Sequence, residues 1–208
     1  MQSGRLCFGA MRIIAGEFRS RGLDAPAGMA TRPTSDRLRE TLFNVLAPRM
    51  EGAAFLDLYA GSGAVALEAV SRGAVRVEAV ERAQPALKAL QANLRKLGAE
   101  RRVRVHAVSV AAYLKRAAGA FDVVFLDPPY DAGAEYEATL RALGGGVVGL
   151  LAAGAVVIAE HRRKEKLEES YGVLTRGRVL EQGDAALSFY SVLSWRVSWR
   201  GWGLAFPP

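Results

Sequence analysis

The chain has 208 residues, half of them hydrophobic, which is enough for one domain with a sizeable core. No apolar run reaches the roughly 18 residues of a membrane span, and the single cysteine, Cys7, excludes an internal disulfide. The formal charge of +7 favours a polyanionic partner such as nucleic acid, and the lack of disulfides fits a cytoplasmic location.

The N-terminal part precedes any regular pattern. Residues 1–10 lack the apolar stretch of a signal peptide, and we expect them to form a disordered extension. Residues 13–23 form a short, arginine-bearing segment that predicts a hairpin or an arm. Thr34 or Ser35 can cap a helix that runs to about Leu46.

After this helix the chain alternates between strands and helices. We expect strands at residues 54–59, 75–80, 103–107, 121–126 and 155–159, and helices at 64–72, 85–98, 110–118 and 135–143. This alternation predicts βαβ units, hence a mostly parallel, Rossmann-like α/β sheet with helices on both faces. Residues 172–180 and 187–193 predict a C-terminal antiparallel hairpin, which gives seven strands in all.

The most informative motif is Asp127-Pro128-Pro129-Tyr130, which follows an apolar strand. In open α/β sheets, ligands bind where strands end. The prolines stiffen the loop and leave carbonyls free to accept hydrogen bonds, and an ionised Asp127 only accepts. With Tyr130 as a stacking face, the motif suits a planar exocyclic amine of a nucleobase. By itself, the motif leaves a simple proline-rich turn as the alternative.

A second motif lies at the end of the first predicted strand. Gly61, Gly63 and Ala66 satisfy the dinucleotide-binding pattern, and Glu81 follows Gly61 by twenty residues, the spacing of a ribose-binding acid. A nicotinamide cofactor must therefore be considered. Against it, Asp57 precedes the glycines, where a carboxylate would repel a pyrophosphate and attract a cation such as an amino group. S-Adenosylmethionine, a sulfonium with a ribose and no phosphate, fits Asp57, Glu81 and the amine-accepting loop.

With these motifs the chain resembles class I S-adenosylmethionine-dependent methyltransferases, and more narrowly the RsmD family of small-subunit ribosomal RNA guanine-N2 methyltransferases. The matching segments are 11–16, 31–37, 40–44, 57–63, 125–130 and 183–190. The Asp-Pro-Pro-Tyr motif marks amino-group methyltransferases broadly, whereas the Arg-Pro-Thr segment at 32–34 narrows the resemblance. The family implies a division into the extension 1–10, a covering segment 11–50, the methyltransferase domain 51–193 and a tail 194–208.

The resemblance also implies a set of site residues and no metal. The catalytic residues would be Asp127, Pro128, Pro129 and Tyr130. The cofactor-binding residues would be Asp57, Tyr59, Ala60, Gly61, Ser62, Gly63, Glu81, Arg82, Val108 and Ser109. An acidic residue is common in the family after the third strand, but this chain has Ala107-Val108-Ser109. We expect Ser109 or backbone amides to contact the adenine instead.

Basic residues form two groups along the chain. The residues expected to grip ribosomal RNA phosphates are Arg12, Arg19, Arg21, Arg32, Thr34 and Arg37. The second group is interpreted as a solvated helix face, with Lys88, Arg95, Lys96, Arg101, Arg102 and Arg104 as its members. His161 heads a basic run and is expected at the surface, and His106 is expected to be structural.

Three alternatives to a guanine-N2 enzyme stay open. The first is an adenine-N6 methyltransferase acting on DNA or RNA, although the chain lacks room for a separate DNA-recognition domain. The second is a side-chain amide methyltransferase, whose relatives usually have Asn in place of Asp127. The third is a non-catalytic RNA-binding protein. We expect a monomer that acts on ribosomal RNA within a small-subunit particle.

Overall fold

The computed structural model describes residues 11–26, 36–129, 133–145 and 149–192. The predicted extension 1–10, the tail 194–208 and the residues Arg32, Thr34 and Tyr130 lie outside the described residues.

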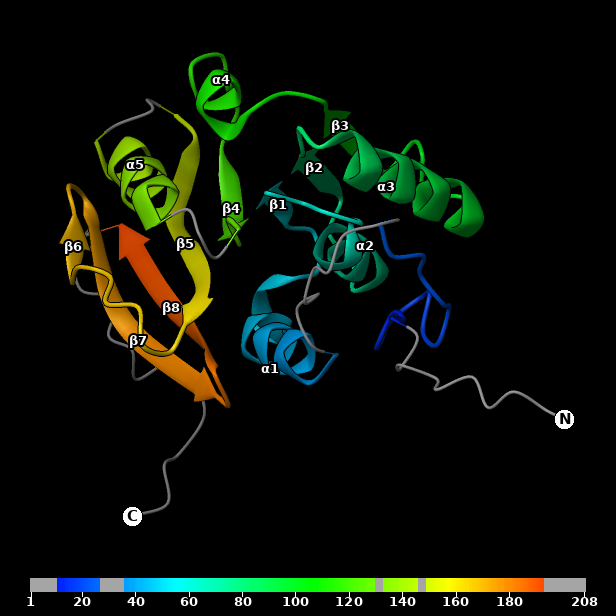
Figure 1. The fold of residues 1–208 in the computed structure, drawn as a ribbon, viewed down its shortest axis with the longest axis horizontal. Coiled ribbons are helices and arrows are strands. Elements are labelled where there is room, and N and C mark those ends of the chain that lie inside the picture. Colours follow the sequence, from blue (N-terminus) through cyan, green and yellow to red (C-terminus); the bar gives the residue numbers. More distant parts are fainter. Residues whose placement is uncertain (1–10, 27–35, 130–132, 146–148, 193–208) are drawn as a thin grey trace, which may run out of the picture.

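The described strands form one mixed sheet in the order β3-β2-β1-β4-β5-β8-β7-β6 (Figure 1). The first five strands are β1 (Ala54–Leu58), β2 (Arg76–Val80), β3 (Val103–His106), β4 (Phe121–Leu126) and β5 (Leu151–Arg162). They pair in parallel, as the alternating sequence predicts. The remaining strands are antiparallel: β6 (Ser170–Tyr171), β7 (Leu174–Gln182) and β8 (Ala185–Val192). The eighth strand, absent from the prediction, is the two-residue β6, which is too short to leave a periodic pattern.

Helices cover both faces of the sheet because successive strand residues point to opposite sides. Phe55 of β1 belongs to the core cluster that includes α1 (Asp36–Leu46), α2 (Ala64–Ser71) and α3 (Gln84–Leu97). Leu56 belongs to the second cluster, with α4 (Val110–Leu114) and α5 (Gly133–Gly144). A short 3-10 helix, η1 (Ala47–Arg49), follows α1. The predicted fold class is therefore confirmed, and within the described residues no helix is long and apolar enough to cross a membrane.

The N-terminal segment 11–24 folds back on itself and packs onto α2. Arg12 and Gly22 form an antiparallel bridge, and Ile13 is fully buried in the first core cluster. The buried Glu68 accepts the backbone N–H groups of Ile14 at 2.8 Å and Ala15 at 3.1 Å. The predicted hairpin or arm is thus a compact loop that one carboxylate fixes to the sheet domain.

The surroundings of two side chains, Arg102 and His161, differ from those predicted. Arg102 was expected on a solvated face, but it is half-buried and its Nη1 donates to Glu17 at 2.5 Å. His161 was expected at the surface, but β5 extends through it and the side chain is buried against Ser188 at 2.8 Å. Burial lowers the pKa of His161, so a neutral imidazole packs there. His106 bonds to Glu78 at 2.7 Å, which agrees with its predicted structural role.

Candidate active site

A cavity of about 1090 Å³ opens at the carboxyl ends of β1 to β4, where the strand order reverses between β1 and β4. This is the position at which open α/β sheets bind ligands. The predicted residues that line it are Asp57, Tyr59, Ala60, Gly61, Ser62, Glu81, Arg82, Val108, Ser109, Asp127, Pro128 and Pro129. The structure thus brings together residues that are far apart in the sequence, because parallel strands end on one edge.

Asp57 lies at the bottom of this cavity and is only 1% exposed. Its Oδ2 accepts the backbone N–H of Ala66, in the first turn of α2, at 3.0 Å. Burial raises the pKa of Asp57 to about 7; the hydrogen bond from Ala66 acts against this, and the charges of Glu81 and Glu160 add to it. A cation beside Asp57 would favour its charged form, so the site is suited to an ammonium group.

Glu81 binds backbone amides with both carboxylate oxygens. Its Oε2 accepts the N–H of Gly61 at 2.8 Å, and its Oε1 accepts the N–H groups of Arg82 and Ala83, each at 2.7 Å. A carboxylate has about four acceptor positions, which leaves room for one hydroxyl donor from a ligand. The Gly61 amide is directed to Glu81 and the Gly63 amide to the Ala60 carbonyl, so two donors of the glycine loop are already engaged, which argues against a pyrophosphate at these two amides.

Asp127 follows β4 and faces the same cavity as Asp57. Its pKa is raised well above the usual range, first by burial and then by the charges of Glu160 and Asp57. Three carboxyl groups are therefore close enough to oppose one another's ionisation. Such an arrangement favours a cationic ligand, which offsets the repulsion among them.

The two prolines of the motif differ in their surroundings. Pro128 is buried and Pro129 is exposed. The Pro128 carbonyl was expected to be free, but it lies 3.4 Å from the Tyr136 hydroxyl, whose single proton is shared with the Glu160 carbonyl at the shorter distance of 2.8 Å. Since a carbonyl has two lone pairs, one position on Pro128 is still available to an amine.

The glycine loop is held by its backbone conformation. Gly63 does not line the cavity; its φ of 81° and its approach to Leu90, where an added Cβ would lie 2.2 Å from Cδ1, require glycine. Tyr59 also has a positive φ, 72°, which costs an L-residue roughly 1–2 kcal/mol. Strain of this kind in a non-glycine residue is typical of functional sites.

The third-strand side of the cavity is less polar. Val108 is 42% exposed and lines it beside Ser109. The Oγ of Ser109 accepts the N–H of Ala112 at 3.2 Å and so caps α4. Contact between Ser109 and an adenine stays a prediction, and the hydroxyl would take part as a donor.

Sequence analysis missed the contribution of α5. Glu135 and Thr139 line the cavity from this helix, four residues apart and thus on one face. Thr139 Oγ1 bonds to the Tyr59 hydroxyl at 2.8 Å, and Arg82 Nη2 lies 3.4 Å from Glu135 Oε1. The spacing of polar residues just after the acceptor motif was the signal that could have identified them.

The N-terminal segment closes one side of the cavity with Met11, Ala25 and Pro26. Asn93 of α3, fully buried, fixes this part of the chain: its Oδ1 accepts the Asp24 N–H at 2.7 Å. Its Nδ2 donates to the carbonyls of Asp24 and Ser62, each at 3.0 Å. Asn93 is a polar residue within the buried stripe of a predicted helix, and this position could have indicated its structural role from the sequence.

The described arginines predicted to bind RNA, Arg12, Arg19, Arg21 and Arg37, are exposed and do not line the cavity. Arg21 Nη2 donates to the carbonyl of Lys96 in α3 at 3.1 Å. The N-terminal segment therefore lies beside the end of α3, and the two basic groups separated in the sequence meet there. Arg95, Lys96 and Arg101 are also exposed at this end of α3 and the turn after it.

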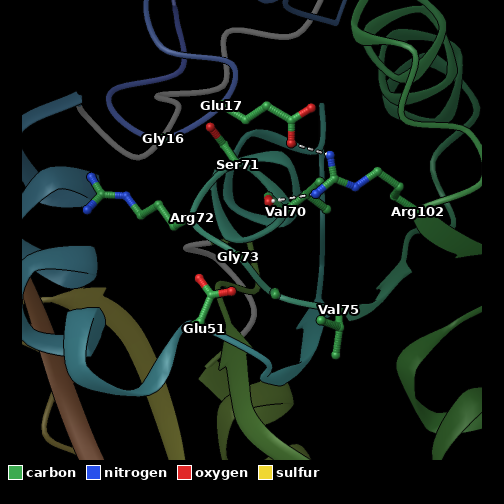
Figure 2. Close-up of a pocket in the computed structure, with 10 residues that line it drawn as sticks. Gly16, Glu17, Glu51, Val70, Ser71, Arg72, Gly73, Val75 and Arg102 are labelled. Atoms are coloured by element: carbon green, nitrogen blue, oxygen red, sulfur yellow. Dashed lines mark hydrogen bonds and ion pairs between the residues drawn. The ribbon is translucent and has the colours of Figure 1, made fainter.

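A second cavity of about 670 Å³ lies at the C-terminal end of α2, and none of Asp57, Glu81 and Asp127 lines it (Figure 2). Its arginines are engaged by the protein: Arg102 bonds to Glu17 and to the Val70 carbonyl, and Arg72 donates to Glu68 at 2.7 Å. It contains no predicted site residue, so the candidate active site is the cavity at the strand ends.

Comparisons with known proteins agree with this geometry. The family model described as Conserved hypothetical protein 95 matches residues 11–191. YlbH of Bacillus subtilis is 35% identical over 188 residues, which cover 86% of this chain and 98% of that protein. Ribosomal RNA small subunit methyltransferase D of Escherichia coli is 41% identical over 127 residues, 60% of this chain and 63% of that protein.

Solved structures show the same architecture. The structure of yhhF from Escherichia coli has a TM-score of 0.78 and 34% identity, and the alignment covers 88% of this chain and 98% of that one. HI0767 of Haemophilus influenzae has a TM-score of 0.73 and 31% identity over 89% of this chain and all of the other.

Proposed function

Since the chain belongs to the family described as Conserved hypothetical protein 95, we propose that it transfers a methyl group from S-adenosylmethionine to the N2 amine of a guanine in small-subunit ribosomal RNA. The observation that carries the proposal is the meeting of Asp57, Glu81 and Asp127 around one cavity at neighbouring strand ends. A ligand there would contact a cation site, a hydroxyl site and an amine site together.

The cofactor fits these residues by charge and by hydrogen-bonding capacity. Asp57 would hold the ammonium of the methionine part, and the remaining acceptor position of Glu81 would hold one ribose hydroxyl. The adenine would lie toward Val108 and Ser109. When bound, the cofactor supplies a methyl group that is already activated by the sulfonium charge. The protein therefore has to position the acceptor and needs little further chemistry.

The acceptor amine is a poor nucleophile because its lone pair is delocalised into the base. Asp127 and the free lone pair of the Pro128 carbonyl would accept its two N–H groups and direct the nitrogen lone pair at the methyl group. Transfer would form the N–C bond as the S–C bond breaks, sulfur would keep the electron pair, and the proton that the amine loses would pass to the Asp127 carboxylate. Tyr130 would stack on the flipped base.

The RNA phosphates would bind the basic surface that the N-terminal segment shares with the end of α3. This surface includes the exposed residues Arg19, Arg21, Arg95, Lys96 and Arg101, and the exposed Arg12 and Arg37 would contact RNA from the start of the segment and from α1. We assign both basic groups to one RNA-binding surface because the Arg21–Lys96 bond joins them. This interpretation replaces that of a merely solvated helix face for Arg95, Lys96 and Arg101.

Methyl transfer from tritiated S-adenosylmethionine tests the proposed function. The acceptors would be free ribosomal RNA, small subunits and DNA, all from cells that lack this protein, with the modified nucleoside identified by mass spectrometry. We expect N2-methylguanosine in RNA. Asp127→Ala should abolish transfer yet still bind S-adenosylhomocysteine, whereas the exposed hairpin variant Asp184→Ala should be unaffected. N6-methyladenosine as the product, or full turnover by Asp127→Ala, would refute the proposal.

Salt dependence tests the RNA surface. Removal of one side chain that binds a phosphate should lower the slope of log affinity against log salt by about 1. We expect this for Arg19→Ala and Arg95→Ala, and no change for Arg178→Ala, a half-exposed residue of β7, which lies near the opposite end of the sheet from β3. Equal slopes for all three variants would show that RNA binds elsewhere.

A further inference from the structure

The first two turns of α5 carry three side chains that reach back to three different loops of the active site. Glu135 lies 3.4 Å from Arg82. One residue later, Tyr136 bonds to the Pro128 carbonyl at 3.4 Å. Thr139 bonds to the hydroxyl of Tyr59 at 2.8 Å.

These loops serve two different parts of the proposed reaction. Arg82 directly follows Glu81, and Tyr59 directly precedes the glycine loop, so both belong to the cofactor side. Pro128 belongs to the acceptor motif. The helix therefore connects the two sides, and it begins at Gly133, shortly after Pro129.

The Tyr59–Thr139 contact is buried on the side of Thr139. Thr139 is 4% exposed, and burial raises the pKa of Tyr59 to about 12, so the phenol keeps its proton at every working pH. Tyr59 has a left-handed backbone, with a φ of 72°, and its hydroxyl contacts Thr139 of α5. A strained residue with a specific, partly buried hydrogen bond is an element that a ligand at the adjacent loop can shift or lock.

We propose that Tyr59 and Thr139 are positioning residues that transmit cofactor occupancy through α5 to the acceptor motif. A cofactor that orders the loop after β1 fixes Tyr59, Tyr59 fixes α5 through Thr139, and Tyr136 of the same helix fixes the Pro128 carbonyl that receives the amine. The inference rests on the proposed function, because it assigns the two sides of the cavity to cofactor and acceptor. It adds that cofactor binding reinforces the contacts that hold the acceptor side.

The kinetic test uses Tyr59→Phe, Thr139→Val and the double variant, with tritiated S-adenosylmethionine and small subunits from cells that lack this protein. Each single variant should lower kcat roughly tenfold, since misplacement by about 1 Å can cost a hundredfold, while KM for the cofactor changes less. The double variant should be no slower than either single one, because both remove the same bond. Thr139→Ser, which keeps the hydroxyl, should restore kcat.

The control is Tyr190→Phe, which removes a phenol that donates to the Glu168 carbonyl at 2.9 Å in the antiparallel part of the sheet. It should leave kcat unchanged. Additive losses in the double variant, or a wild-type kcat in Thr139→Val, would overturn the inference.

Hydrogen exchange separates this inference from the proposed function. S-Adenosylhomocysteine should slow amide exchange in residues 133–144 of the wild type, and this protection should vanish in Thr139→Val although the ligand still binds. Equal protection in both proteins would overturn the inference and leave the proposed function standing. A wild type that does not bind S-adenosylhomocysteine would overturn both.

Discussion

Replacement of Asp57 by asparagine should make the protein more stable and unable to use its cofactor. Asparagine keeps an oxygen that can accept the Ala66 N–H, as Asp57 does at 3.0 Å, and it removes the charge. The carboxylate is 1% exposed, so solvent does not screen it. The change therefore isolates the energetic cost of a buried negative charge that the proposed function requires.

The magnitude follows from the raised pKa of Asp57, from 3.8 to about 7. The folded protein holds this proton more tightly than the unfolded chain, so the free energy of unfolding falls as pH rises from about 4 to about 7 and then levels off. At about 1.4 kcal/mol for each tenfold difference in proton affinity, the fall is about 4 kcal/mol. Asparagine does not titrate, so the stability advantage of Asp57→Asn over the wild type should grow by this amount as the pH rises from 4 to 8.

Urea unfolding of both proteins at pH 5 and pH 8, without cofactor, measures the difference. The matched control is Asp122→Asn, because Asp122 also accepts one backbone N–H, that of Ala54 at 2.8 Å, but is half-exposed. At pH 8 a gain of about 4 kcal/mol would raise the melting temperature by roughly 8–16 °C for a chain of this size. The same stability difference at both pH values would refute the reasoning.

The binding of S-adenosylhomocysteine provides a second measurement on the same residue. The ammonium should bind the ionised form of Asp57, so the affinity of the wild type should fall by up to about tenfold per pH unit below pH 7. Asp57→Asn should bind weakly at every pH. Tight binding by the variant would show that the ammonium is held elsewhere.

Glu68→Gln should cost about 3–5 kcal/mol, since it removes the buried charge that pairs with Arg39 and Arg72 and places an amide donor against one of the Ile14 and Ala15 N–H groups. Its urea midpoint measures this loss, and a stability within about 1 kcal/mol of wild type would contradict the argument. Gly16→Ala should also destabilise, because its φ is 80° and the new Cβ would lie 1.8 Å from a backbone oxygen of α2. Gly52→Ala, with a φ of 74° and no atom within 4 Å, should lose only the roughly 1–2 kcal/mol of the left-handed backbone. Equal losses in the two glycine variants would mean that the close approach is relieved at no cost.

The parallel sheet and the three carboxyl groups at its edge could be predicted from the pattern of residues along the chain. Alternating apolar strands and amphipathic helices leave one way to bury both faces, and parallel strands must end on one edge. Asp57, Glu81 and Asp127 each lie at the end of a strand, so their meeting could be predicted without coordinates.

Which polar side chains contact each other depends on how the helices and the N-terminal segment pack on the sheet. Thr139 reaches Tyr59 across 80 residues, and Arg21 reaches Lys96 across 75, by contacts that depend on how α5 and the N-terminal segment pack. The pKa of Asp57 likewise depends on burial and on Glu160, which lies on a strand distant in the sequence. Local patterns encode which face of an element is buried, whereas the partner of a polar group and the dielectric around it arise only when separate elements come into contact.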